Sequence, residues 1–124
     1  MILKKKILVV IDDESSLLEM LLVRLNHSGY DAFGAAGGQE GLDLARQKML
    51  DLILLDKVMP KMNGCEVAGI MKKDEMLKSI PIILISAEAG NIEERARECG
   101  AAGYLSKPFE TETLLVMISK HLAT

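Results

Sequence analysis

Three short runs of consecutive apolar residues interrupt an otherwise mixed sequence. They lie at Ile7–Ile11, Leu52–Leu55 and Ile80–Ile85. Apolar residues in unbroken order, rather than alternating with polar ones, are typical of strands that helices cover on both faces. Weaker patterns predict two more strands, at Asp31–Ala35 and Ala102–Leu105. The chain is therefore expected to contain five short, mostly buried strands.

The segments between and after these strands carry apolar residues at the three-to-four residue spacing of one helix face. Five such sets predict five helices: Leu17, Leu18, Leu21, Leu22 and Leu25; Leu42, Ala45 and Met49; Val67, Ile70 and Met71; Ile92, Ala96 and Cys99; Leu114, Leu115, Ile118 and Leu122. We expect the first helix to end near Gly29, which suits a left-handed C-cap, and the last to begin close to Thr111. Asn91 and Glu94 have the spacing of a capping box at the start of the fourth helix.

Strand and helix thus alternate five times along a chain of 124 residues. That length is typical of one domain, and we expect residues 1–124 to form a single one. Because crossovers between parallel strands are right-handed, the order predicts an α/β fold, a doubly wound five-stranded parallel sheet with helices on both faces. In such sheets functional groups gather at the carboxyl ends of the strands.

Charged and hydroxyl side chains follow four of the five predicted strands. They are Asp12, Asp13 and Glu14 after the first strand, Asp56 after the third, Ser86 after the fourth, and Lys107 with Pro108 after the fifth. Each alone has an ordinary structural explanation, since an aspartate pair often caps a helix and Asp56, Ser86 or Lys107 would suit a turn. Their arrival at the same edge of one sheet favours a shared functional site instead.

Three aspartates in one site repel one another unless a cation lies between them. Mg²⁺ suits such a site, because it binds one or two carboxylates and keeps positions open for water or phosphate oxygens. Lys107 and Ser86 can offer a positive charge and a hydroxyl donor to a phosphate. Asp56 can serve as a nucleophile that forms an acyl phosphate. Together these residue types predict phosphoryl transfer to Asp56.

Four segments carry, in order and at matching spacing, the motifs of a known family. They are Ile7–Glu14, Asp56–Gly64, Ile82–Ala87 and Gly103–Phe109. On these segments the sequence resembles the receiver domain of bacterial response regulators in two-component signalling, and in particular the single-domain chemotaxis regulators. The resemblance covers residues 6–121 and implies a flavodoxin-like fold with strand order 2-1-3-4-5.

The resemblance implies a role for each acidic residue at the strand ends. Asp56 would take a phosphoryl group from a phosphohistidine of a sensor histidine kinase or a histidine phosphotransfer protein. Asp13, Asp56 and the backbone carbonyl of Val58 would bind Mg²⁺, or Mn²⁺ in its place. Asp12 would act on the metal largely through water.

The resemblance also implies a switch. Lys107 would pair with the phosphoryl oxygens, and its peptide bond to Pro108 would be cis. Ser86 would close over the phosphoryl group while Tyr104 swings inward. The surface of the fourth helix, fifth strand and fifth helix would then bind a downstream protein partner differently. Such a domain assists its own phosphorylation and dephosphorylation but is a signalling switch, not a turnover enzyme.

Two residues beside Asp56 depart from the family pattern. Lys57 stands where the family usually has an apolar residue, and it would alter metal affinity or charge matching with a partner. Val58 offers no side-chain hydrogen bond to a water that attacks the acyl phosphate, and Glu88 flanks the same path. Lys57, Val58, Ala87 and Glu88 are the expected tuning positions, and Val58 with Glu88 is expected to set the lifetime of the phosphorylated state.

Composition limits the other functions. The net charge of −3 argues against direct nucleic-acid binding, which needs a basic face, and Lys4–Lys6 is too short a basic run to supply one. Cys65 and Cys99 are far apart and lack metal-ligand spacing, so both are predicted to be reduced, without a disulfide. Neither a signal peptide nor an apolar segment of membrane length is apparent, so a cytoplasmic protein with no membrane contact is expected.

Three other functions are compatible with the fold alone. A phosphorylation-independent interaction module would have no need for the full acidic set with Lys107. A phosphatase or phosphotransferase with an aspartyl intermediate would need a cap or substrate pocket for which the chain is short. A flavodoxin-like cofactor binder would carry a hydroxyl- and glycine-rich loop where this chain has acids. The strand-end residues therefore favour the phosphoacceptor domain.

Overall fold

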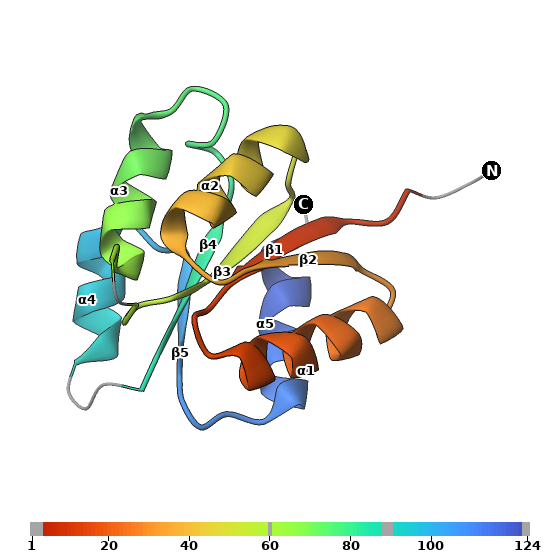
Figure 1. Cartoon of the computed structure of the whole chain (residues 1–124). Coiled ribbons are helices and arrows are strands. Elements are labelled where there is room, and N and C mark those ends of the chain that lie inside the picture. Colours follow the sequence, from red (N-terminus) through yellow and green to blue (C-terminus); the bar gives the residue numbers. More distant parts are fainter. Residues whose placement is uncertain (1–3, 60, 88–90, 123–124) are drawn as a thin grey trace.

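The computed structural model describes residues 4–59, 61–87 and 91–122, in which five strands alternate with five helices (Figure 1). The strands are β1 (Ile7–Ile11), β2 (Asp31–Ala35), β3 (Leu52–Asp56), β4 (Ile82–Ser86) and β5 (Gly103–Ser106). The helices are α1 (Ser15–His27), α2 (Gly38–Gln47), α3 (Gly64–Lys73), α4 (Ile92–Cys99) and α5 (Thr111–Leu122). The predicted alternation of strand and helix is confirmed.

The five strands form one parallel sheet in the order β2-β1-β3-β4-β5, as predicted. Ile11 pairs with Leu55, so Asp12 follows β1 level with Asp56 at the end of β3. Ser86 ends β4 opposite Ser106, and Lys107 follows one residue later. The register therefore brings the strand-end residues of β1, β3, β4 and β5 to one edge of the sheet.

Two cores lie on opposite faces of this sheet, and the strands contribute alternate residues to each. Helices α2, α3 and α4 cover one face and α1 and α5 the other (Figure 1). In β1, Val9 and Ile11 point into the first core while Leu8 and Val10 point into the second. All four side chains are buried, which explains why the central strands are unbroken apolar runs.

Strand β4 begins two residues later than predicted. Pro81 lies just before it and has no backbone N–H to donate to the ladder, although its carbonyl accepts from Ile53 N at 3.1 Å. Strands β3 and β4 also extend one residue further, to Asp56 and Ser86. These two side chains are thus held by the sheet itself and not by flexible loops.

Helix starts follow the expected capping chemistry only in part. Asn91 accepts a hydrogen bond from Glu94 N at 3.3 Å, but the Glu94 carboxylate accepts from the Asn91 side chain and not from its backbone. The full capping box belongs to α3. There Asn63 accepts from Glu66 N at 2.9 Å, and the Glu66 carboxylate accepts from Asn63 N at 3.4 Å.

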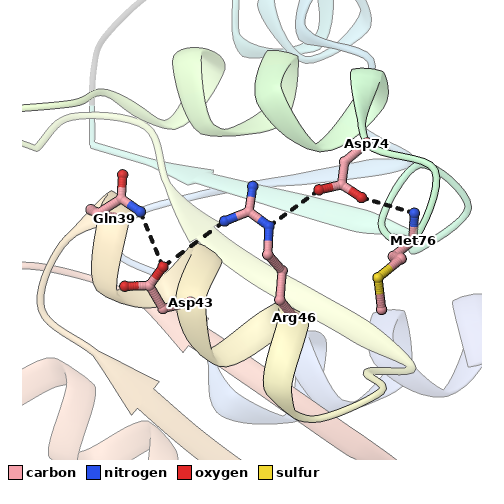
Figure 2. A network of polar contacts seen from close by, with 5 residues as sticks. All are labelled: Gln39, Asp43, Arg46, Asp74 and Met76. Carbon is pink, nitrogen blue, oxygen red and sulfur yellow. Dashed lines mark hydrogen bonds and ion pairs between the residues drawn. The ribbon is translucent and has the colours of Figure 1, made fainter.

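A polar network joins α2 to the end of α3 (Figure 2). Arg46 of α2 contacts both Asp43, at 3.9 Å, and Asp74, at 3.2 Å, and Gln39 donates to Asp43. The backbone N–H of Met76 donates to Asp74 at 2.8 Å and is the main cause that lowers the pKa of this carboxyl group. Exposed ion pairs of this kind orient neighbouring helices but add little stability.

Cys65 and Cys99 form a disulfide, so the prediction of two reduced cysteines is wrong. The two residues are 34 positions apart in sequence, but their Cα atoms are 5.1 Å apart. Helices α3 and α4 lie side by side on one face of the sheet, and the first turn of α3 meets the last turn of α4 (Figure 1). Spacing along the chain carries no information on this contact.

Among the described residues, no helix has both the length and the apolar character needed to cross a bilayer.

The start of α3 is packed closely against the end of β3. An added methyl group at Gly64 is therefore expected to lower the stability of the fold. A Cβ on Gly64 would lie 2.6 Å from the Asp56 carbonyl oxygen and 2.9 Å from the Lys57 Cα atom, both of them backbone atoms. We expect Gly64→Ala to lower the free energy of unfolding by about 1–3 kcal/mol in denaturant titrations.

Gly69→Ala is the matched control in the same helix. A Cβ there meets nothing within 4 Å, so the free energy of unfolding is expected to rise by about 0.5–1 kcal/mol from helix propensity. Equal stabilities of the two variants would contradict the close packing of Gly64.

Candidate functional site

Asp56 lies at the centre of a polar cluster at the carboxyl edge of the sheet. Its side chain is buried, as is that of Asp12, which follows β1. The ammonium nitrogen of Lys107, which follows β5, lies 3.5 Å from Asp56 Oδ1 and 3.2 Å from Asp12 Oδ2. Three segments far apart in sequence thus bring two carboxylates and one ammonium into contact.

Asp12 is held in place by hydrogen bonds on every side. Its backbone N–H donates to Ala35 O at 3.1 Å, and its Oδ1 atom accepts from Glu14 N at 2.9 Å. Its Oδ2 atom accepts from Lys107 Nζ. Both carboxylate oxygens of Asp12 therefore have partners. Asp13 is exposed at the mouth of the cluster.

The pKa of Asp56 is raised from its ordinary value of 3.8 to about 6. Burial is the largest cause, followed by the negative charge of Asp12. The ammonium of Lys107 and the backbone N–H of Val58, which bonds the Asp56 carboxyl group, oppose the rise. Burial by itself would lower the pKa of Lys107, but the charges of Asp56 and Asp12 outweigh it and raise that pKa.

The carboxylates fit a hard divalent cation. One oxygen from each of Asp12, Asp13 and Asp56 lies within 4.8 Å of the other two. Three carboxylates against a single ammonium leave an excess of negative charge, and oxygen ligands of this type suit Mg²⁺. Both oxygens of Asp12 accept hydrogen bonds from the protein, whereas Asp13 is the exposed carboxylate of the three.

The predicted switch residues lie on the neighbouring strands. Ser86 is buried at the end of β4, and its carbonyl accepts from Lys107 N at 2.8 Å. Tyr104 lies on β5 with 37 % of its surface exposed, which places it at the outer edge of the sheet. The Lys107–Pro108 peptide bond is cis, in agreement with the resemblance.

Three of the four expected tuning positions lie directly after β3 or β4. Val58 and Ala87 are exposed, and Lys57 is half-buried. The backbone N–H of Lys57 donates to Ile85 O at 2.8 Å, which ties the loop after β3 to β4. Glu88 lies outside the described residues.

Gly64 is a residue of this site that the sequence reasoning missed. Its backbone N–H donates to Lys57 O at 2.8 Å, and its missing side chain lets α3 begin against the backbone of Asp56. The available signal was its place directly after Asn63, whose side chain caps α3. A glycine one position past a capping residue has many uses, so its function could not be read from sequence alone.

Known proteins share this sequence pattern. A model of the response regulator receiver domain family matches residues 8–119. The polar-differentiation response regulator DivK of Brucella ovis is 39% identical over 121 residues, which cover 95% of this chain and 96% of DivK. The DNA-binding dual master transcriptional regulator RpaA of Synechocystis is 34% identical over 113 residues. That match covers 90% of this chain but 46% of RpaA, so this chain spans less than half of RpaA.

Solved structures share the fold over nearly the whole chain. The chemotaxis protein CheY4 of Vibrio cholerae superposes with a TM-score of 0.90 at 31% identity, covering 96% of this chain and 100% of CheY4. The HemR receiver domain of Leptospira biflexa superposes with a TM-score of 0.86 at 30% identity, covering 97% of this chain and 96% of HemR.

The raised pKa of Asp56 predicts a pH-dependent stability in Mg²⁺-free buffer. Because the pKa is higher in the folded chain than its ordinary value of 3.8, the fold favours the protonated carboxyl group. Stability from this group is present below about pH 4 and is lost as pH rises toward about 6. Asp56→Asn should therefore match the wild type near pH 4 and exceed its free energy of unfolding by about 1–3 kcal/mol near pH 7.

Denaturant titrations across this pH range measure the difference. Asp31→Asn, an exposed aspartate on the edge strand β2, is the control and should show no such trend. A constant difference between Asp56→Asn and wild type from about pH 4 to about pH 7 would show that Asp56 is not perturbed in this way.

Proposed function

We propose, from the premise that this chain belongs to the response regulator receiver domain family, that Asp56 accepts a phosphoryl group from a phosphohistidine. The chain is a receiver domain of the two-component response regulator type, which is a signalling switch. The observation that carries the proposal is the buried Asp56 carboxylate, grouped with Asp12 and Asp13 and within 3.5 Å of the Lys107 ammonium.

In the proposed transfer, a carboxylate oxygen of Asp56 attacks the phosphorus atom of the donor in line with its phosphorus–nitrogen bond. The new oxygen–phosphorus bond forms an acyl phosphate while the phosphorus–nitrogen bond breaks, and the electron pair leaves with the donor imidazole. A pKa of about 6 keeps Asp56 mostly ionised at neutral pH, as a nucleophile must be. Lys107 balances the charge of the phosphoryl oxygens, and the Ser86 hydroxyl donates to one of them.

Asp13, Asp56 and the backbone carbonyl of Val58 would hold Mg²⁺, or Mn²⁺, and Asp12 would act on it through water. A bound Mg²⁺ supplies positive charge next to the phosphoryl oxygens and lowers their repulsion toward the Asp56 carboxylate. The indirect role of Asp12 is supported by its hydrogen bonds to Glu14 N and Lys107 Nζ, which occupy both of its oxygens. Lys107 remains the protein's own counter-charge.

The proposed output is a shift between two conformers. A phosphoryl group on Asp56 adds charge and strong acceptors that draw Ser86, and with it Tyr104, inward. The face formed by α4, β5 and α5 then binds a downstream protein partner differently. The buried Ser86 and the partly exposed Tyr104 lie on adjacent strands, which supports coupling between the two residues.

We assign the phosphoryl donor to a sensor histidine kinase or a histidine phosphotransfer protein. The proposed location of this function is the cytoplasm. The domain assists its own phosphorylation and dephosphorylation without turning over a substrate. The proposed downstream partner is a protein and not nucleic acid, because the net charge of −3 argues against binding to a phosphate backbone.

Intact mass after incubation with Mg²⁺ and a small acyl phosphate tests the phosphoacceptor directly. We expect the wild type to gain one phosphoryl group, and Asp56→Asn, or wild type with the metal chelated, to gain none. No gain in the wild type with Mg²⁺ would favour a phosphorylation-independent interaction module of the same fold.

The lifetime of the phosphorylated state is expected to depend on position 58. Val58 is 51 % exposed beside Asp56, and its side chain offers no hydrogen bond to an attacking water. Val58→Asn should therefore speed the loss of the phosphoryl group, on the order of tenfold if the amide orients that water. Val58→Leu is the control of equal polarity. Decay followed by mass in both variants and in Glu88→Ala measures the effect, and rates equal to wild type in all three would refute the role.

A further inference from the structure

The disulfide between Cys65 and Cys99 joins the first turn of α3 to the last residue of α4. Both residues are half-buried. We propose that this pair is a thiol–disulfide exchange site for low-molecular-weight thiols and disulfides, and that its oxidised form restrains the switch of this domain. The restraint rests on the proposed phosphoacceptor function, whereas the exchange site stands without it.

One end of the bond is next to the phosphoacceptor. Gly64, directly before Cys65, donates its N–H to Lys57 O at 2.8 Å. A Cβ on Gly64 would lie 2.6 Å from the Asp56 carbonyl oxygen, so the first turn of α3 rests on the backbone of Asp56. The sulfur of Cys65 is thus attached to the element that packs against the reacting strand.

The other end of the bond is next to the proposed output face. Cys99 is followed by Gly100, which ends α4 in the left-handed conformation. Ala101 N then donates to Ala96 O at 2.9 Å and Ala102 N to Ile82 O at 2.8 Å, so the turn runs directly into β5. Tyr104 follows on that strand. The disulfide therefore links α3, which packs against the proposed phosphorylation site, to the turn that leads from α4 into β5.

Helices α3 and α4 also pack through contacts other than the bond. Val67, Ala68 and Met71 of α3 and Ala96 of α4 belong to one buried core beneath the sheet. Reduction is therefore expected to loosen α4 and not to unfold the chain. These other contacts are what allow the pair to cycle between two folded forms.

The exchange balances with a low-molecular-weight disulfide as the oxidant. A thiolate of the pair attacks one sulfur of that disulfide, forms a mixed disulfide and releases one small thiol. The second cysteine attacks the mixed disulfide, the Cys65–Cys99 bond forms, and a second small thiol leaves. The protein loses two electrons and two protons, which the two released thiols carry. Reduction is the reverse, with two small thiols consumed.

The oxidised form should favour the conformer seen here. In that conformer Tyr104 is 37 % exposed, and the switch would draw it inward. A covalent link between Cys65 and Cys99 opposes any conformer in which α4 moves away from α3. Since coupling is reciprocal, a bond that disfavours the switched conformer also disfavours phosphorylation of Asp56.

A redox titration tests the exchange site. The full chain is equilibrated in buffers of reduced and oxidised glutathione at varied ratios, quenched in acid, labelled with a maleimide and weighed intact. We expect a single two-electron transition between a doubly labelled and an unlabelled chain, with the oxidised form melting on the order of 10 °C higher. Cys99→Ser, as control, should give only one label or one glutathione adduct.

Two labels at every glutathione ratio would overturn the exchange site, because the bond would then not form. The exchange site would also be overturned if excess dithiothreitol, added under native conditions, left the chain unlabelled. The bond would then be inert to exchange. Either result stands whether or not the chain accepts a phosphoryl group.

The restraint is tested by the rate at which Asp56 gains a phosphoryl group from acetyl phosphate with Mg²⁺. We expect the oxidised wild type to be phosphorylated about fivefold more slowly, or more, than the reduced wild type. The double variant Cys65→Ser/Cys99→Ser should match the reduced form in both buffers. Equal rates for the oxidised and reduced wild type would overturn the restraint.

If no form of the chain gains a phosphoryl group, the proposed function fails and hydrogen exchange decides the restraint. Backbone amides of α4 and β5 must then exchange more slowly in the oxidised than in the reduced chain. Equal exchange in the two forms would overturn the link between the disulfide and these elements.

Discussion

Among the described residues, the Lys107 ammonium contacts two buried carboxylates at the carboxyl edge of the sheet, and Asp13 adds a third carboxylate beside them. Lys107 lies 3.2 Å from Asp12 and 3.5 Å from Asp56, both of which are buried. Burial is the largest cause that raises the pKa of Asp56 to about 6, and the negative charge of Asp12 adds to it. The excess of carboxylate charge suits a hard divalent cation, and Lys107 supplies a positive charge for an anionic group such as phosphate. The parallel sheet holds these like charges side by side at one edge.

The sequence predicted this part of the molecule well because the relevant physics is local. Unbroken apolar runs require a strand covered on both faces, and the residue at the end of each run must then lie at the edge of the sheet. This rule alone predicted that four residues lie close together: Asp12, Asp56, Ser86 and Lys107. The rest depended on distances across the fold. Cys65 and Cys99 meet because α3 and α4 lie side by side on one face of the sheet. Their separation of 34 residues in sequence does not predict this contact.

Similar local patterns also had different outcomes, because their surroundings differ. Asn63 and Glu66 form both bonds of a capping box, whereas Asn91 and Glu94, at the same spacing, form only one. At α3 the preceding loop is tied down by the bond from Gly64 N to Lys57 O. The start of α3 is therefore tied to the loop after β3, and it connects the backbone of Asp56 to the disulfide. The proposed phosphoacceptor and the proposed exchange site therefore lie next to the same helical turn, the first turn of α3.

The most direct test of this account is whether the acidic cluster binds Mg²⁺, measured as the melting temperature against Mg²⁺ concentration. A ligand that binds only the folded chain raises the melting temperature as its concentration passes the dissociation constant. The account predicts a saturable rise for the wild type and for the surface control Asp31→Asn, and a rise lost or shifted to much higher Mg²⁺ in Asp13→Asn. A melting temperature that Mg²⁺ leaves unchanged in the wild type, or raises equally in Asp13→Asn, would contradict it.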